Sequence, residues 1–236
     1  MCGRYSLSTP DVDVARVLHA EVLGEGLPGP HWQIRPTDAV AVVVESSKQP
    51  GRRMEGARWD LARPWQRGPR QPGPPLINVR SETANEKFAW ALQRRRCLLP
   101  ANGYWEWTGP KGRRQPNYFR SRSDRVIAFA GLYSWLQDSS RDEDDPNRWK
   151  LTAALLTTAA DERLSEIHDR TPLILPVEEW DLWLDPHTSG DQDLVDRAVA
   201  ASRWPTADLE YYPVRQFGIA DESEDLGSAS RGRPRM

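Results

Sequence analysis

Cys2 has the most distinctive chemistry in this sequence, because it stands directly after the initiator methionine. A small second residue generally permits removal of Met1, and the chain would then begin with a free cysteine. Such a residue offers two nucleophiles, an α-amine with a pKa of about 7.7–8.0 and a thiol with a pKa of about 8.5. With an aldehyde, the amine forms a Schiff base and the thiol closes a five-membered thiazolidine ring. The alternative is an incidental small residue near a frayed terminus, and position alone leaves both open.

Asn78 and Arg80 place an amide and a guanidinium two residues apart, within the hexapeptide Asn-Val-Arg-Ser-Glu-Thr. In an extended segment such side chains lie on the same face, so both can reach one ligand. Arg80 could clamp a phosphate with its planar fork, and Asn78 could hold a sugar or carbonyl oxygen. A hydrogen-bond network at a strand end would explain the same residues equally well.

Glu106 lies between Trp105 and Trp107 in a strand-like alternation. An apolar wall raises the pKa of a carboxyl group and suits it to proton transfer. The alternative is a surface glutamate on the outer face of a hairpin.

His168 is followed by Asp169 and Arg170 in a turn just after a predicted helix. The imidazole could act as a general acid or base, and Arg170 could contact a phosphate, although a lone histidine is more often structural. The sequence contains no Gly-rich phosphate loop, serine nucleophile elbow, HExxH pair or cysteine zinc spacing. We therefore expect no nucleotide cofactor and no required metal.

The elements that must position these residues are predicted from periodicity and capping signals. We expect a first helix from Ser8-Thr9-Pro10-Asp11 to about Gly24 and further helices over 82–93, 161–167, 178–184 and 191–201. We expect strands over 39–45, 125–133, 150–158, 173–175 and 209–214. Residues 97–107 should form a strand pair or strand-turn around Asn102-Gly103. No repeat or mid-chain linker is visible, so these elements predict one α+β domain dominated by sheet. We place this domain at residues 2–217 and expect a disordered polar tail over 218–236, which lacks periodicity.

Charge is distributed unevenly along the chain, although the net charge is only −2. Residues 52–125 contain 17 Lys and Arg against 6 Asp and Glu, a net +11, whereas residues 126–236 contain 11 against 22, a net −11. The basic block suggests a surface for a polyanion. Mutual neutralisation of the two blocks in the fold is the alternative.

The length and composition exclude several protein classes. A chain of 236 residues with eleven Trp can bury a sizeable core, which excludes full disorder. No apolar run approaches the roughly 20 residues that span a bilayer, and residues 1–5 lack the apolar region of a signal peptide. Two Cys make no disulfide framework. We expect a cytoplasmic protein.

Several of these segments, taken in order along the chain, are specific in combination. The sequence resembles the SOS-response-associated peptidase (SRAP) family, which forms DNA–protein crosslinks at abasic sites. The matching segments are Met-Cys-Gly-Arg-Tyr at the start, Arg58-Trp59-x-Leu61-x-x-Pro64-Trp65, Asn78-x-Arg80-Ser81-Glu82-Thr83, Arg95-Arg96-Cys97-Leu98-x-Pro100-Ala101-x-Gly103-x-x-Glu106-Trp107, Phe129-Ala130-Gly131-Leu132 and His168-Asp169-Arg170-x-Pro172. The resemblance implies a largely antiparallel, barrel-like core with peripheral helices and a basic DNA-binding groove.

The resemblance also implies the catalytic residues. The family's catalytic cysteine falls on Cys2, whose product with the ring-opened abasic sugar would be a thiazolidine in single-stranded DNA. By motif, Asn78 would orient the opened sugar and Cys2, Glu106 would assist the proton transfers, and His168 would promote ring opening. The family name records an older proposal of cysteine-dependent proteolysis, perhaps limited to removal of Met1. A Schiff base at an abasic site can also drive β-elimination, which implies a weak lyase side activity.

The implied partner is single-stranded DNA that contains abasic sites, with no membrane partner, and we expect a monomer that associates with the nucleoid when bound to DNA. Arg4, Arg80 and Arg170 would hold the flanking phosphates, and Trp65 and Trp107 would stack on neighbouring bases. Two positions depart from the family pattern near the proposed site. Asn102 stands where Asp is usual, and Thr171 where Met is usual.

Two other functions remain open from the residues alone. One is a peptidase that acts on other proteins through a Cys2–His168 dyad, although nothing in the sequence identifies the oxyanion hole that it would need. The other is a non-covalent binder of single strands that uses Arg and Trp side chains alone.

Overall fold

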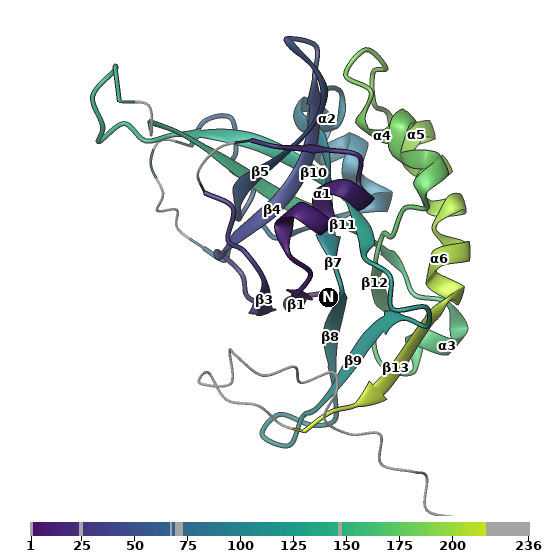
Figure 1. Ribbon diagram of the computed structural model, residues 1–236. Helices are drawn as coiled ribbons and strands as arrows, with labels where there is room; N and C mark the ends of the chain where they lie inside the picture. The colour runs from purple at the N-terminus through teal and green to yellow at the C-terminus, as the bar shows by residue number, and fades with distance from the viewer. Residues whose placement is uncertain (1, 24–25, 67, 69–72, 146–147, 216–236) are drawn as a thin grey trace, which may run out of the picture.

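The computed structural model describes residues 2–23, 26–66, 68, 73–145 and 148–215 (Figure 1). The tail predicted over 218–236 lies outside these residues. In the described residues, no helix is both long enough and apolar enough to cross a membrane.

The smaller of two sheets carries the amino-terminal strand in its interior. Its strand order is β13-β9-β8-β1-β3. Its members are β1 (Tyr5–Leu7), β3 (His31–Ile34), β8 (Gly103–Thr108), β9 (Gln115–Ser121) and β13 (Leu209–Pro213). Tyr5 pairs with Tyr104 of β8 on one side and with Ile34 of β3 on the other. The backbone that follows Cys2 is therefore held from both sides.

The larger sheet has the order β12-β11-β10-β7-β4-β5-β2, and an additional pairing joins β11 to β5. Its members are β2 (Glu21–Val22), β4 (Ala39–Ser46), β5 (Gln49–Trp59), β7 (Arg96–Ala101), β10 (Ile127–Gln137), β11 (Trp149–Ala159) and β12 (Arg170–Pro172), and β6 (Asn78–Arg80) pairs in parallel with β11. The β5–β11 pairing closes five strands into a ring, and closure leaves those strands without a free edge. This confirms the predicted α+β fold with a barrel-like, largely antiparallel core.

Helices cover the barrel from outside. They are α1 (Asp11–Val17), the 3-10 helix η1 (Ser81–Thr83) with α2 (Ala84–Leu92), α3 (Glu162–Ser165), the 3-10 helix η3 (Val177–Glu179) with α4 (Trp180–Leu184), α5 (Gln192–Ala201) and α6 (Arg203–Ala207). Figure 1 shows α4, α5 and α6 along one side of the molecule. Arg96 holds α4 against β7, because its buried guanidinium donates hydrogen bonds to the carbonyls of Trp183 and Asp185, each at 2.6 Å.

The chain passes from the barrel to the smaller sheet at Asn102-Gly103. β7 and β8 are consecutive, but each pairs with other strands, so this segment is a strand-turn and not a hairpin. Gly103 is required at the crossing, because an added Cβ would lie 2.3 Å from the carbonyl oxygen of Phe119. Asn102 fixes the crossing to β1: its Oδ1 accepts from the amides of Ser8 (2.8 Å) and Thr9 (3.0 Å).

Aromatic contacts join the two sheets. Tyr5 packs edge-on against Trp59 of β5 and Phe129 of β10, with ring centroids 5.0 and 5.8 Å apart. Tyr104 of β8 also packs edge-on against Phe129, at 6.1 Å. Each pair adds about 0.5–1.5 kcal/mol beyond its area burial. The strand that follows Cys2 is therefore anchored in the core.

The structure corrects the bounds of two expected elements. The first helix ends at Val17 and does not reach Gly24. The strand β12 lies at Arg170–Pro172, and the strand expected over 173–175 is reduced to backbone hydrogen bonds with β10, from the Ala130 amide to the Leu173 carbonyl and from the Leu175 amide to the Ala128 carbonyl. The eleven-residue β5 was not predicted, because Arg52, Arg53 and Glu55 interrupt its apolar pattern. Those charges are accommodated by ion pairs: Arg52 with Glu45 (3.0 Å) and Arg53 with Glu55 (3.1 Å).

Candidate functional site

Cys2 lies fully buried at the entry to β1. Its Sγ donates weakly to the carbonyl of Arg4, at 3.7 Å. Burial raises the pKa of the Cys2 thiol well above its usual range, and the nearby Glu106 carboxylate raises it further. The sulfur is therefore a neutral thiol at physiological pH, and a proton acceptor is needed to activate it.

Asn78 binds Cys2 directly. It opens β6, which pairs with β11 through Leu155, and its Nδ2 donates to the Cys2 carbonyl at 2.9 Å. Its Oδ1 is buried, and no described residue donates a hydrogen bond to it. One end of this amide thus orients the cysteine while the other end can accept from a ligand.

Glu106 is a buried carboxyl on β8, 5% exposed. Burial raises its pKa to about 7, and the negative charge of Asp169 adds to this effect. This burial agrees with the expectation of a carboxyl suited to proton transfer and not with the alternative of a surface glutamate. At neutral pH the group is close to half protonated, so it can both accept and donate a proton.

His168 lies in the turn between α3 and β12, and its side chain is 28% exposed. Its Nδ1 accepts from the backbone amide of Arg170 at 3.0 Å, and Asp169 Oδ1 stands 2.8 Å from the same nitrogen. The pKa of His168 is lowered, first by partial burial. Partial burial thus favours the neutral ring, whereas the Asp169 carboxylate favours the imidazolium.

The four predicted catalytic residues are brought together from four separate segments. Asn78 hydrogen-bonds Cys2, Glu106 acts electrostatically on the Cys2 thiol, and Asp169, beside His168, acts on Glu106. A hydrogen bond between Tyr104 Oη and Thr171 Oγ1 (3.2 Å) ties β8 to β12. In the described residues, no group of three or more His, Cys, Asp or Glu side chains could hold a metal ion.

The three predicted phosphate ligands differ in their surroundings. Arg80, at the end of β6, is exposed, and none of the described residues forms a hydrogen bond or ion pair with its side chain. Arg4 donates to Gln33 Oε1 at 3.2 Å. Arg170 has its fork occupied by Glu82, at 2.6 and 3.0 Å, and also donates to the Thr157 carbonyl at 2.6 Å.

The two predicted stacking residues also differ. Trp65 is 70% exposed in the segment after β5. Trp107 is half-buried on β8, and the Arg4 guanidinium lies 5.3 Å from its ring centroid. A base stacked at Trp107 would therefore lie beside a cation.

Sequence reasoning did not identify Gln33 and Glu82 as partners of the site residues Arg4 and Arg170. Gln33 is fully buried and engages Arg4. Each partner is distant in sequence, 29 residues from Gln33 to Arg4 and 88 from Glu82 to Arg170, so no local pattern could reveal it.

Comparison with known proteins places these features in a family. The chain is 30% identical over 220 residues to the abasic site processing protein YoqW of Bacillus subtilis, covering 91% of this chain and 92% of that protein. It is 27% identical over 219 residues to the abasic site processing protein YedK of Escherichia coli, with the same coverage.

Solved structures show the same fold. A protein from Bacteroides thetaiotaomicron superposes with a TM-score of 0.69 at 21% identity, covering 91% of this chain and 93% of that one. A phage-related protein from Bordetella bronchiseptica superposes with a TM-score of 0.62 at 28% identity, covering 91% and 95%. The family model for SOS response associated peptidase (SRAP) matches residues 1–217. The chain belongs to the SRAP family.

Proposed function

We propose that this protein captures abasic sites in single-stranded DNA covalently, through Cys2, and so shields them during the response to DNA damage. The observation that carries the proposal is the buried Cys2 held by Asn78 beside a carboxyl group, Glu106, whose pKa is about 7. Relatives that are named abasic site processing proteins support the same substrate.

The reaction requires cleavage of the bond between Met1 and Cys2, which frees the α-amine. The amine attacks the aldehyde carbon of the ring-opened sugar, and loss of one water gives an imine. The thiol then adds across the C=N bond, its proton passes to the imine nitrogen, and the thiazolidine ring closes. The net change is one C–N bond and one C–S bond formed, with one water released.

The surrounding residues fit the proton transfers in this sequence. Glu106, with a pKa near 7, can take a proton from the amine or thiol and return it to the departing hydroxyl. His168 can protonate the sugar ring oxygen as an imidazolium, a form that the Asp169 carboxylate favours, and so open the ring. Asn78 Oδ1, buried without a donor among the described residues, is suited to accept from the sugar or the freed amine.

A general peptidase activity fits the site less well. A cysteine peptidase uses a thiolate paired with an imidazolium. Here burial raises the pKa of the Cys2 thiol and lowers that of His168, so both groups are driven to their neutral forms. Removal of Met1 by the protein itself, and a weak β-elimination from the imine, remain side activities of the proposal.

Mass spectrometry of the mature protein with an abasic oligonucleotide tests the proposal. The expected adduct has the mass of both molecules less one water and resists borohydride, because the closed ring has no imine to reduce. Cys2→Ala keeps the amine and should give only a reducible imine. Cys97→Ala is the matched control, since Cys97 is also fully buried but lies on β7. An irreducible adduct formed by Cys2→Ala would overturn the mechanism.

A further inference from the structure

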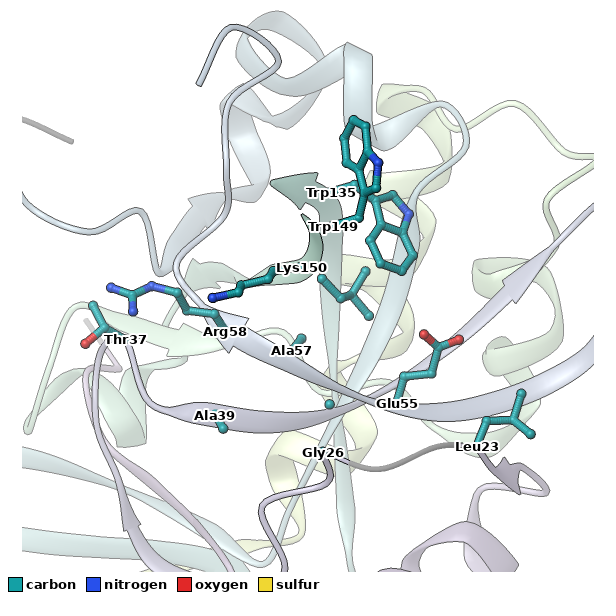
Figure 2. A pocket seen from close by; sticks show the side chains of 12 residues that line it. Leu23, Gly26, Thr37, Ala39, Glu55, Ala57, Arg58, Trp135, Trp149 and Lys150 are labelled. Carbon is teal, nitrogen blue, oxygen red and sulfur yellow. The ribbon is translucent and has the colours of Figure 1, made fainter. Parts of the chain in front are cut away.

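A groove lies where the closing pair of barrel strands separates. β5 and β11 pair through Arg58–Thr152 and Trp59–Ala153. Earlier along both strands, residues 55–57 and 149–151 form opposite walls of a groove of about 680 Å³ (Figure 2). A second hollow of about 430 Å³ adjoins it and shares Glu55, Trp135 and Leu151.

Two tryptophans line one wall of this groove. Trp135 of β10 pairs with Leu151, and Trp149 lies two residues before Leu151, so the two indoles are diagonal neighbours on one face of the sheet. They are 43% and 52% exposed. Tyr133 lines the adjoining hollow. Exposed indoles in a concave site offer flat, apolar surfaces on which a base can stack.

The opposite end of the groove carries positive charge. Figure 2 shows the Arg58 and Lys150 side chains extending in the same direction, toward Thr37, with Glu55 further along the groove. The two cations are only loosely held: Arg58 stands 3.6 Å from Asp60, and Lys150 stands 4.0 Å from Asp138.

The remaining charges also favour an anionic ligand. Glu55 is the one acidic residue that lines either hollow, and it is paired with Arg53 at 3.1 Å. Lys48 adds a further cation to the adjoining hollow. Beyond the Arg53–Glu55 pair, three cations (Arg58, Lys150 and Lys48) therefore line the two hollows, and cations beside exposed aromatic rings are the features that bind single-stranded nucleic acid.

The groove lies apart from Cys2. Tyr5 packs on Phe129 near the start of β10, and Trp135 stands six residues further along that strand, about 20 Å at ~3.3 Å per residue. The segment that carries Trp65 approaches the same end of β10, because the Gly68 amide donates to the Gln137 carbonyl at 3.0 Å. Trp65 therefore belongs to a segment that links the end of β5 to the groove.

We propose that this groove binds a second stretch of the single strand whose abasic site is captured at Cys2, stacking bases on Trp135 and Trp149 and holding phosphates with Arg58 and Lys150. The inference rests on the proposed function for its ligand. Charge complementarity and the paired indoles favour a nucleic acid over a peptide or a second copy of this chain.

Affinity for intact single strands of two lengths tests the inference. Fluorescence anisotropy is measured with labelled oligonucleotides of about 5 and about 16 nucleotides, the range of single-strand site sizes. Trp149→Ala and Lys150→Gln should each weaken binding of the longer strand by about tenfold and leave the shorter strand unchanged. Trp204→Ala and Arg203→Gln are the matched controls, because both side chains are exposed on α6, away from the groove.

Adduct formation with the short abasic strand is recorded in parallel, so the two proposals fail separately. If the groove variants form the adduct in normal yield but lose affinity only for the longer strand, the result supports DNA binding in the groove. Unchanged affinity for the longer strand in both variants overturns it, even if the adduct forms. A change in oligomeric mass of the variants, with unchanged DNA affinity, would also overturn it and point to a second copy as the occupant.

Discussion

Glu106 shows how a single residue acquires its chemistry from its surroundings. A raised pKa was predicted from the flanking Trp105 and Trp107, but side chains alternate along β8, so both indoles lie on the opposite face and the burial that raises the pKa comes from the fold. The ion pair of Arg170 could not be predicted from the sequence, because its partner Glu82 is 88 residues away and a bidentate pair depends on the folded arrangement. Arg170 was predicted to contact phosphate, and that role stays a prediction. Its fork must release Glu82 before it can hold a phosphate bidentately.

Glu106→Gln should make stability less dependent on pH. The folded pKa is about 7 and the ordinary value is 4.5, so the wild-type protein gains stability from this carboxyl below pH 4.5 and loses it as pH rises through 7. Between pH 4.5 and pH 8 the wild type should lose about 3 kcal/mol of stability relative to the Gln variant. Urea unfolding at the two pH values measures the difference. A constant difference across this range would contradict the assignment.

The same substitution should slow crosslinking. A positioned acid–base group contributes about 10²–10⁴-fold to a rate, so Glu106→Gln should lower the rate of adduct formation by at least about a hundredfold. The wild-type rate should change with an apparent pKa near 7, and the variant should lose that feature. Quenched time courses from pH 5 to 9 measure both.

Tyr5→Phe tests a buried hydroxyl in the core. Tyr5 Oη is buried, and no residue in the described part of the chain forms a hydrogen bond with it. An unsatisfied buried hydroxyl costs about 1–3 kcal/mol, so the Phe variant should be more stable by about 1 kcal/mol. Thermal unfolding measures the change. A lower melting temperature would reveal a partner such as a buried water.

At the scale of the elements, the strand-turn between β7 and β8 controls where Glu106, the proposed catalytic carboxyl, lies. Strands and helices with strong periodicity, such as β4 and α5, could be predicted because their own residues determine them. The length of β5 could not be predicted, since its charged residues break the apolar pattern and Arg52 finds its partner, Glu45, on β4. That β7 and β8 belong to different sheets depends on Gly103 lying against Phe119, a contact across strands.

Asn102→Ala should destabilise this corner by about 2 kcal/mol. It removes the Oδ1 that accepts from the amides of Ser8 and Thr9, leaving two half-buried donors without a partner. Asn102→Asp should be nearly neutral, because a carboxylate supplies the same acceptor. This equivalence explains why Asp is usual at this position. Chemical unfolding of the two variants measures the contrast, and equal destabilisation by both would refute it.

At the scale of the whole molecule, the basic block contributes Arg80 and Trp107 to the Cys2 site and Arg58 to the groove. The charge pattern could be read from the sequence. The strands that close the barrel could not be predicted, because the contact between β5 and β11 joins residues almost a hundred positions apart.

Arg80→Gln should reduce the salt dependence of DNA binding. Each phosphate neutralised on a single strand contributes about −0.7 to the slope of log affinity against log salt. Arg80 is exposed, with no hydrogen-bonding partner among the described residues, so its loss should reduce the slope by about that amount. Arg197→Gln is the control, since that side chain is exposed but paired with Glu179 at 2.8 Å. Titrations at several salt concentrations give the slopes, and an unchanged slope would remove Arg80 from the interface.

The central position of β1 has a mechanical consequence for a crosslinked protein. Tension on the DNA would enter the polypeptide at Cys2 and pass at once to a strand clamped between β3 and β8. Both sets of backbone hydrogen bonds would have to shear together before the protein could be pulled off intact. A translocating motor on the captured strand would therefore meet a rigid block, and disassembly would proceed more readily from the opposite end of the polypeptide.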